Sequence, residues 1–298
     1  MNKLIKITII TAICLVVAGS VLFLIAAISL GFNFRNANGS AEKTFTVSET
    51  FINVNYNSDE YDVWFLPSTD GTVKVQAFEF ENNEFKVEVE DGTLKIGRDD
   101  QRKWYERMQP FNYDYNISVY LPIGEYGELT AKTLSADVNL SKDLSFTYVS
   151  IDTLSGDVSG TVNCKGKVGI ETASGDVELF GLDGSALTVN TTSGDIDVDN
   201  SVLENMAVRS ASGELSLENV TATTFDFHTV SGDIELEKCD AQTVKIETTS
   251  GGVDCNFLTG KIYNVKTTSG RTRLPQSDAS GGTCDVKTTS GDIEIRIG

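Results

Sequence analysis

A short phrase returns at a nearly constant spacing through the second half of this sequence. Each copy contains Ser-Gly, usually followed by Asp, as in the stretch "NTTSGDIDV" that begins at Asn190. The serines of the phrase are Ser155, Ser174, Ser193, Ser212, Ser231, Ser250, Ser269 and Ser290, with a degenerate copy at Ser135. Neighbouring serines lie 19 residues apart, except at the first and last steps of 20 and 21. A fixed period of this length indicates a solenoid in which each repeat forms one coil.

Between these phrases the residues alternate between apolar and polar. Ile196 and Val198 follow the phrase of their repeat, and Leu187 and Val189 precede it; the equivalent positions in other repeats are also apolar. A period of two in stretches rich in Thr, Val and Ile is typical of strands with one buried face. We therefore predict an all-β fold, a parallel β-solenoid (a right-handed β-helix) with 19-residue coils. Residue i should stack on residue i+19 at the strand spacing of about 4.8 Å.

The Ser-Gly phrase is expected at the corner where one strand bends into the next. Its order fits a type II turn, whose third position, here Gly194, needs a positive φ. Acidic residues follow the glycine in most repeats and should form an outward ladder: Asp157, Asp176, Asp195, Glu214, Asp233 and Asp292. Such a ladder attracts cations loosely, but the glycine-rich nonapeptide repeats of calcium-binding β-rolls are absent. We therefore predict no metal site and no cofactor.

The N-terminus contains one long apolar segment. Residues 7–32 carry no charge, and about 20 apolar residues suffice to cross a bilayer. A cleaved signal peptide has an apolar region of only roughly 7–15 residues, so we expect a transmembrane signal-anchor helix, with cleavage as the alternative. Lys3 and Lys6 precede the segment, which predicts a cytoplasmic tail over residues 1–6 and an extracytoplasmic remainder. The expected location is the cell membrane, with a single membrane pass.

Three regions follow this anchor. Residues 33–44 are small and polar and are interpreted as a linker. Residues 45–132 are strand-rich but lack the phrase, so we interpret them as an irregular start or cap of the solenoid, since solenoids need atypical end units. Residues 133–298 form the regular solenoid. Cys164, Cys239, Cys255 and Cys284 lie in this last region and are expected to be buried free thiols, with a Cys239–Cys255 disulfide left open.

The net charge excludes one class of partner. The chain carries −19, and Lys3 and Lys6 are the only charges in residues 1–32, so the remainder carries −21. Binding of nucleic acid needs a basic face, and no nucleic-acid partner is therefore expected. The same charge argues against adsorption of the exported domain to anionic lipid.

The search for catalytic residues finds no candidate. The single histidine, His228, has no partner motif, and the recognised hydrolase, metalloprotease and nucleotide-binding motifs are absent. Carboxylates are abundant, but each occupies a repeat position, so no pair is singled out for glycoside hydrolysis. We predict that the protein is not an enzyme, with a polysaccharide-active β-helix enzyme as the remote alternative.

Two segments depart from the repeat. Residues 99–116 mix basic and aromatic side chains, and Trp104, Tyr105 and Arg107 are weak candidates for binding an envelope glycan or protein. The alternative is that these aromatic residues plug the end of the solenoid. In the last long coil, Arg271 and Arg273 stand where acids are the rule.

The docking of the final strand is expected to depend on these two arginines. In the expected stack Arg271 lies beside Asp292, and Arg273 lies between Asp254 and Glu294. The C-terminal strand is then the edge of the sheet, with its backbone groups free on one side.

An apolar anchor, the stretch "VYLPIGEYGELTAKTLSADVNL" from Val119 and the repeated "TTSGDI" together resemble a known bacterial family. It is the β-strand-repeat family of unknown function that carries the adhesin label, with the LiaG-like proteins of cell-envelope stress operons among its members. The resemblance covers residues 45–298 and implies an envelope-displayed β-helix without established catalytic residues. We therefore expect a binding or scaffold (adhesin-like) protein of the envelope. The alternative is an accessory or sensor subunit of an envelope-stress system that acts on a membrane partner.

Overall fold

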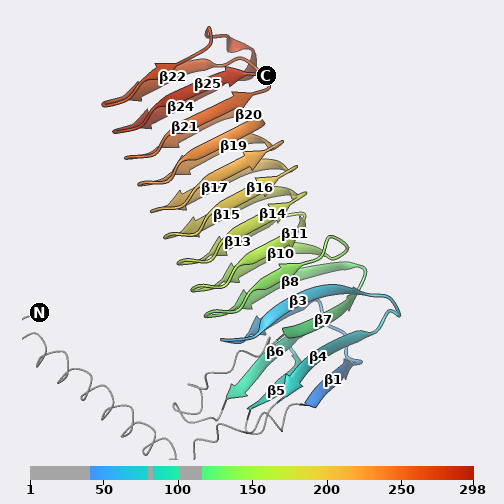
Figure 1. The fold of residues 1–298 in the computed structure, drawn as a ribbon. Coiled ribbons are helices and arrows are strands. Elements are labelled where there is room, and N and C mark those ends of the chain that lie inside the picture. Colours follow the sequence, from blue (N-terminus) through green and yellow to red (C-terminus); the bar gives the residue numbers. More distant parts are fainter. Residues whose placement is uncertain (1–40, 80–82, 101–115) are drawn as a thin grey trace, which may run out of the picture.

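The computed structural model of the chain describes residues 41–79, 83–100 and 116–298. Their strands stack into one rod, shown in Figure 1, in which each regular coil contributes one strand to each of two sheets. In spatial order, sheet A contains β1 (Ala41–Val47), β4 (Val73–Glu79), β7 (Asn116–Pro122), β3 (Asp62–Ser68), β9 (Val138–Leu140), β11 (Val158–Thr161), β14 (Val177–Phe180), β16 (Ile196–Asp199), β18 (Leu215–Glu218), the start of β20 (Ile234–Glu247), β21 (Val253–Phe257), β25 (Ile293–Ile297) and β23 (Thr272–Arg273).

Sheet B forms the other side of the rod. In spatial order it contains β5 (Asn83–Glu90), β6 (Thr93–Asp100), β2 (Asn53–Asn57), β8 (Glu125–Lys132), β10 (Ser145–Asp152), β12 (Asn163–Cys164) with β13 (Lys167–Glu171), β15 (Asp183–Thr191), β17 (Val202–Ser210), β19 (Thr221–His228), the end of β20, β24 (Thr283–Thr288) and β22 (Ile262–Thr267).

The register confirms the predicted parallel solenoid with 19-residue coils. Val177 pairs with Ile196, and Ile196 pairs with Leu215, each one coil further along. The inward residues of both sheets, such as Val198 and Phe227, are fully buried and form one continuous core along the rod. The alternation that predicted strands is therefore the alternation between core and solvent.

The corner glycines serve a different purpose from the one predicted. Gly194 does not adopt the positive φ of a type II turn, so that assignment is wrong; among the Ser-Gly corners only Gly213 has a positive φ, 118°. A Cβ on Gly194 would lie 1.9 Å from the carbonyl oxygen of Gly175 in the preceding coil. Thr191, which is buried, accepts the N–H of Gly194 on its Oγ1 at 3.0 Å. Close stacking of successive backbones, rather than turn conformation, therefore requires glycine here.

A recurring left-handed residue lies at the opposite corner, between sheet A and sheet B. Gly181, Asn200, Asn219 and Lys238 occupy the same position in successive coils and have φ values of 66°, 50°, 55° and 52°. Glycine and asparagine are the residues that adopt this conformation at least cost. Lys238 is the exception among them.

Both ends of the rod depart from chain order. At the N-terminal end, β2 and β3 lie between the β6–β7 coil and the β8–β9 coil. The outermost pairs there, β1–β4, β4–β7 and β5–β6, are antiparallel. At the C-terminal end, β24 lies between β20 and β22, and β25 lies between β21 and β23 (Figure 1). At each end of the rod, two strands are therefore inserted one coil further inward than chain order would place them.

This insertion corrects the expected edge. The C-terminal strand β25 is not the outermost strand, because β21 pairs with it along its whole length and β23 pairs with residues 293–294 on its other side. Arg271 pairs with Asp292 at 2.6 Å, as predicted, and Arg273 pairs with Glu294 at 3.0 Å. Arg273 does not lie beside Asp254, since β25 separates them; Arg296 pairs with Asp254 instead, at 2.6 Å. The inserted strand therefore makes ion pairs on both of its sides.

The cysteines follow the prediction. Cys164, Cys239, Cys255 and Cys284 are buried free thiols, and no disulfide joins Cys239 to Cys255. Residues 7–32 lie outside the described residues, and within the described ranges no helix is long and apolar enough to span a bilayer.

Candidate functional site: an axial groove on sheet B

The acidic ladder was the most conspicuous candidate for a functional site. In the structure, its carboxylates accept hydrogen bonds from backbone N–H groups instead. Oδ1 of Asp157 accepts the backbone N–H of Asp176 at 2.8 Å, and Oδ1 of Asp195 accepts that of Glu214 at 2.8 Å. Asp233 accepts the N–H of Gly252 at 2.6 Å in the same way. Each carboxylate thus supplies an acceptor for a corner N–H of the next coil. No group of carboxylate, thiol and imidazole side chains suited to a metal ion occurs in the described part of the chain.

A cluster of charged side chains around His228 lies on the outer face of sheet B. His228 lies between two carboxylates, with its Nε2 3.0 Å from Oδ1 of Asp226 and its Nδ1 3.3 Å from Oε2 of Glu247. Arg209 donates to Oδ2 of Asp226 at 2.7 Å, and Lys287 donates to Oε1 of Glu247 at 3.3 Å. These five side chains come from four neighbouring strands, β17, β19, β20 and β24.

The charges of this cluster compensate one another. Burial opposes ionisation of Asp226, but the hydrogen bond and the charge of Arg209, together with His228, outweigh it and lower the pKa of the carboxyl. Burial likewise opposes ionisation of Glu247, while Lys287 and Lys245 lower its pKa. Both carboxylates are therefore held ionised by cations on adjacent strands. Among the described residues His228 contacts Asp226, Lys245 and Glu247, and none of these is a hydroxyl or thiol nucleophile.

Three hollows join along this face to form one groove, here called the axial groove. The first, of about 430 Å³, is lined by residues that include Tyr148, Asp152 and Gly169. The second, of about 460 Å³, shares Glu171 and Asn190 with the first. The third, of about 430 Å³, shares His228 and Thr229 with the second and extends to Lys287. The axial groove therefore crosses the coils from β8 to β24, perpendicular to the strands.

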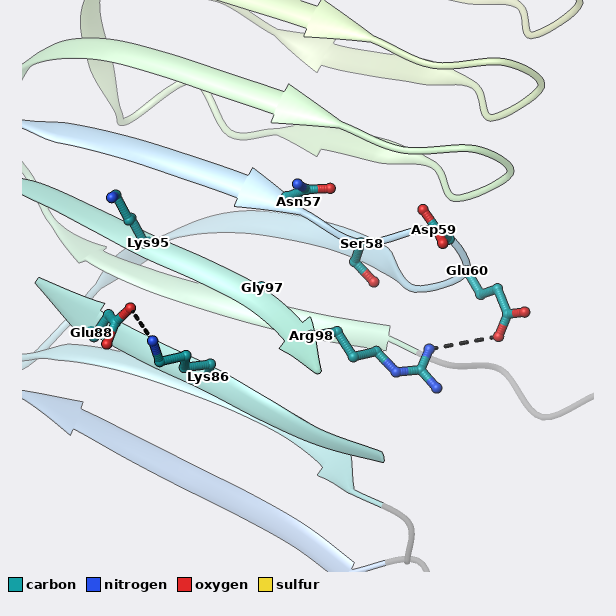
Figure 2. Close-up of a pocket in the computed structure, with 9 residues that line it drawn as sticks. All are labelled: Asn57, Ser58, Asp59, Glu60, Lys86, Glu88, Lys95, Gly97 and Arg98. Atoms are coloured by element: carbon teal, nitrogen blue, oxygen red, sulfur yellow. Dashed lines mark ion pairs between the residues drawn. The ribbon is translucent and has the colours of Figure 1, made fainter. Parts of the chain in front are cut away.

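Another hollow lies near the N-terminal end of the rod, where β2, β5 and β6 meet (Figure 2). Its volume is about 400 Å³, and Asn57, Ser58, Asp59, Glu60, Lys86, Glu88, Lys95, Gly97 and Arg98 line it. The Arg98 guanidinium lies over the ring of Tyr61 at 4.4 Å and 3.6 Å from Oε2 of Glu60, and Lys86 pairs with Glu88 at 2.6 Å. Cations and acids in this hollow pair with one another. The hollow therefore presents less unpaired charge to a ligand than the number of its charged residues suggests.

The structure does not test the sequence-predicted binding residues. Trp104, Tyr105 and Arg107 lie outside the described residues. Sequence reasoning missed Tyr148 and Gly169 and treated His228 as an isolated surface residue. One signal was present: Gly169 is the outward residue between Ser150 and Thr188 in the stacked repeats, where a side chain is otherwise present. Comparison of outward as well as inward positions would have found it.

Comparisons with known proteins agree with this fold. A family model described as Toastrack DUF4097 matches residues 52–218 and 185–298. No curated protein matches the sequence. A crystal structure from Parabacteroides distasonis, provisionally named a lipid-binding protein, is 18% identical with a TM-score of 0.52, covering 87% of this chain and 97% of that one. Structures provisionally named adhesins, from Parabacteroides merdae and Bacteroides fragilis, are 13% and 15% identical, with TM-scores of 0.47 and 0.40; each alignment covers 87% of this chain and 97% or 98% of the other. These likenesses concern the fold alone.

Proposed function

Since the chain belongs to the Toastrack DUF4097 family, we propose that it is a non-enzymatic binding or scaffold protein of the cell envelope. Residues 7–32 hold it in the cell membrane, and the solenoid lies outside the cell. The observation that carries the proposal is the axial groove, an open channel across many coils of one rigid sheet. A long, shallow channel fits an extended ligand better than a small substrate that must be enclosed.

The absence of an enzymatic role rests on the use of the polar groups. The corner carboxylates accept backbone N–H groups, and the carboxylates around His228 are paired with cations. A catalytic nucleophile needs an adjacent base. In the described part of the axial groove His228 contacts Asp226, Lys245 and Glu247 and no hydroxyl or thiol, which supports binding without turnover.

Sedimentation with isolated cell envelopes tests the binding role. The full-length chain, purified in detergent, is mixed with envelope fragments of its host and centrifuged. Glu171→Arg changes the floor of the axial groove, and Glu178→Arg makes the same change on the exposed face of sheet A. We expect the first variant to lose most of its co-sedimentation and the second to keep it. Equal binding by both variants, or none by the wild-type chain, contradicts the proposal.

Digestion of intact protoplasts tests the location. External protease should remove the solenoid and leave a small fragment that contains residues 7–32, because Lys3 and Lys6 keep the N-terminus inside. Complete protection of the solenoid contradicts the proposed topology. Stoichiometric co-purification of a second membrane protein, with no binding to envelopes, favours the accessory-subunit alternative.

A further inference from the structure

Gly169 has no structural reason to be glycine. Its φ lies outside the left-handed region, and a Cβ built on it would meet no atom within 4 Å. It therefore differs from Gly194, where the preceding backbone excludes a side chain. Glycine inside a strand costs conformational entropy and packing, and it often marks a place where a ligand approaches the backbone closely.

The gap above Gly169 lies between polar side chains. Gly169 pairs with Ser150 of β10 and with Thr188 of β15, and all three point outward on sheet B. Because the middle residue has no side chain, the hollow of about 430 Å³ reaches the backbone here. At this point the floor of the axial groove is backbone between polar side chains.

An exposed aromatic ring borders the same hollow. Tyr148, on β10 two residues before Ser150, is 55% exposed. Its ring lies against Gly166, where a Cβ would be 3.1 Å from ring atom Cε1. The ring is therefore supported by backbone on one side and open to solvent elsewhere. Burying an exposed tyrosine ring against a ligand contributes substantially to binding.

The remaining lining residues select the kind of ligand. They offer hydroxyl, amide, ammonium and carboxylate groups: Ser150, Thr188, Asn190, Lys132, Lys167, Glu128, Asp152 and Glu171. Such groups hydrogen-bond to a ligand that carries many hydroxyls around its rim. The net charge of −21 outside residues 1–32 disfavours polyanions at long range. A peptide that binds by strand addition would need a free sheet edge for its backbone, and the middle of a sheet face has none.

We propose that Tyr148 and Gly169 form a subsite for one pyranose ring of a neutral glycan. The apolar C–H face of the sugar lies on the Tyr148 ring, its edge enters the gap above Gly169, and its hydroxyls bond to Ser150, Thr188 and Asn190. The glycan then continues along the axial groove, across successive coils. This inference rests on the proposed binding function and names the class of ligand that this site takes.

Calorimetric titration of the full-length chain in detergent tests the subsite. The probes are β-1,4-linked hexasaccharides of N-acetylglucosamine and of glucose, both neutral. Gly169→Ala places a methyl group in the gap without a clash, so folding is preserved. We expect Tyr148→Leu to weaken binding of a probe about tenfold, because it removes the ring contact. Gly169→Ala should weaken binding by a similar factor, because its methyl group occupies the gap.

Two matched control variants show whether a loss of probe binding is specific to the subsite. Gly97→Ala alters another strand glycine of sheet B whose Cβ would make only an ordinary 3.6 Å contact, and Phe180→Leu removes a 51% exposed ring outside the groove. Both should bind as the wild-type chain does. Probe binding that survives Gly169→Ala and Tyr148→Leu overturns the subsite. So does a wild-type chain that sediments with envelopes but binds neither probe, a result that leaves the proposed function intact. Loss of both kinds of binding in the wild-type chain removes the proposed function as well.

Discussion

Oδ1 of Asp176 accepts the backbone N–H of Asp195, one coil further along, at 2.8 Å. The N–H of Asp176 in turn donates to Oδ1 of Asp157, also at 2.8 Å. The two bonds make Asp176 a link between three successive coils at the Ser-Gly corner. The repeated aspartate is therefore explained by the backbone that it completes, without any bound cation.

Replacement of this carboxylate should show the size of the effect. Asp176→Ala leaves the N–H of Asp195 without its acceptor, and we expect a loss of about 1–2 kcal/mol in the free energy of unfolding, the lower range for a hydrogen bond to a charged group. Asp176→Asn keeps a side-chain oxygen and should cost much less. Urea unfolding followed by circular dichroism measures both. Equal destabilisation by the two variants would show that charge, not the acceptor, matters.

The corner glycine should tolerate no side chain. Gly194→Ala places a Cβ 1.9 Å from the carbonyl oxygen of Gly175, which belongs to rigid backbone. We expect destabilisation of about 1–3 kcal/mol or more, as for overpacking of a tight core. Gly169→Ala, which meets no atom within 4 Å, is the matched control and should not lower stability. A Gly194→Ala midpoint equal to wild type would refute the close stacking.

Lys238 offers a stabilising substitution. Its φ of 52° is left-handed, and the equivalent residues of the two preceding coils are Asn219 and Asn200. Lys238→Asn should stabilise the chain by up to about 1 kcal/mol, because asparagine adopts this conformation at lower cost. The exposed pair with Glu218, at 3.6 Å, is lost but contributes little. The reverse change, Asn219→Lys, should lower the melting temperature; a rise there would contradict the explanation.

The buried thiols predict a loss of stability at alkaline pH. Burial raises the pKa of the Cys239 thiol from 9.0 to about 11 and that of Cys284 to about 12. The unfolded chain therefore releases these protons at lower pH than the folded chain does. The stabilisation is complete below pH 9.0 and is lost as the pH rises from there through 11 and 12.

Cys239→Val isolates the contribution of one thiol. Val220 occupies the equivalent buried position in the preceding coil, so valine should fit. Unfolding free energies measured between neutral pH and about pH 10 should fall less steeply in this variant than in wild type. Identical slopes would mean that Cys239 does not titrate on unfolding.

The inserted C-terminal strand predicts an unusual pattern of hydrogen exchange. Residues 293–297 pair with β21 along their whole length, and residues 293–294 also pair with β23, whereas β22, at residues 262–267, pairs only with β24 among the described strands. Amides of β25 should exchange at least about tenfold more slowly than those of β22. Arg273→Glu removes the pair with Glu294 and should speed exchange near residues 262–273 while residues 293–297 stay protected by β21. Faster exchange in β25 than in β22 would restore the C-terminal strand as the edge.

The sequence alone determined the coil. Alternation fixes which residues of a strand face the core, and the 19-residue period places Val177 beneath Ile196 and Ile196 beneath Leu215. Both signals can be recognised without knowledge of the fold, because the alternation is local and the period repeats regularly. The buried thiols and the pairing of Arg271 with Asp292 follow from the same register.

Only the tertiary structure decided the order of the last coils and the purpose of the corner. The phrase "KTTSG" occurs at both Lys266 and Lys287, so β24 suits the position beside β20 as well as β22 does, and the repeat cannot rank the two orders. At this end of the rod the buried Lys261 donates to the carbonyl oxygens of Ala241 and Gly281, contacts that the repeat does not encode. The sequence places Gly194 in the Ser-Gly phrase and Gly169 within a strand, but it does not show what lies over either glycine. They differ because a carbonyl from the neighbouring coil lies over the first and open space lies over the second, a distinction that exists only once the coils are stacked.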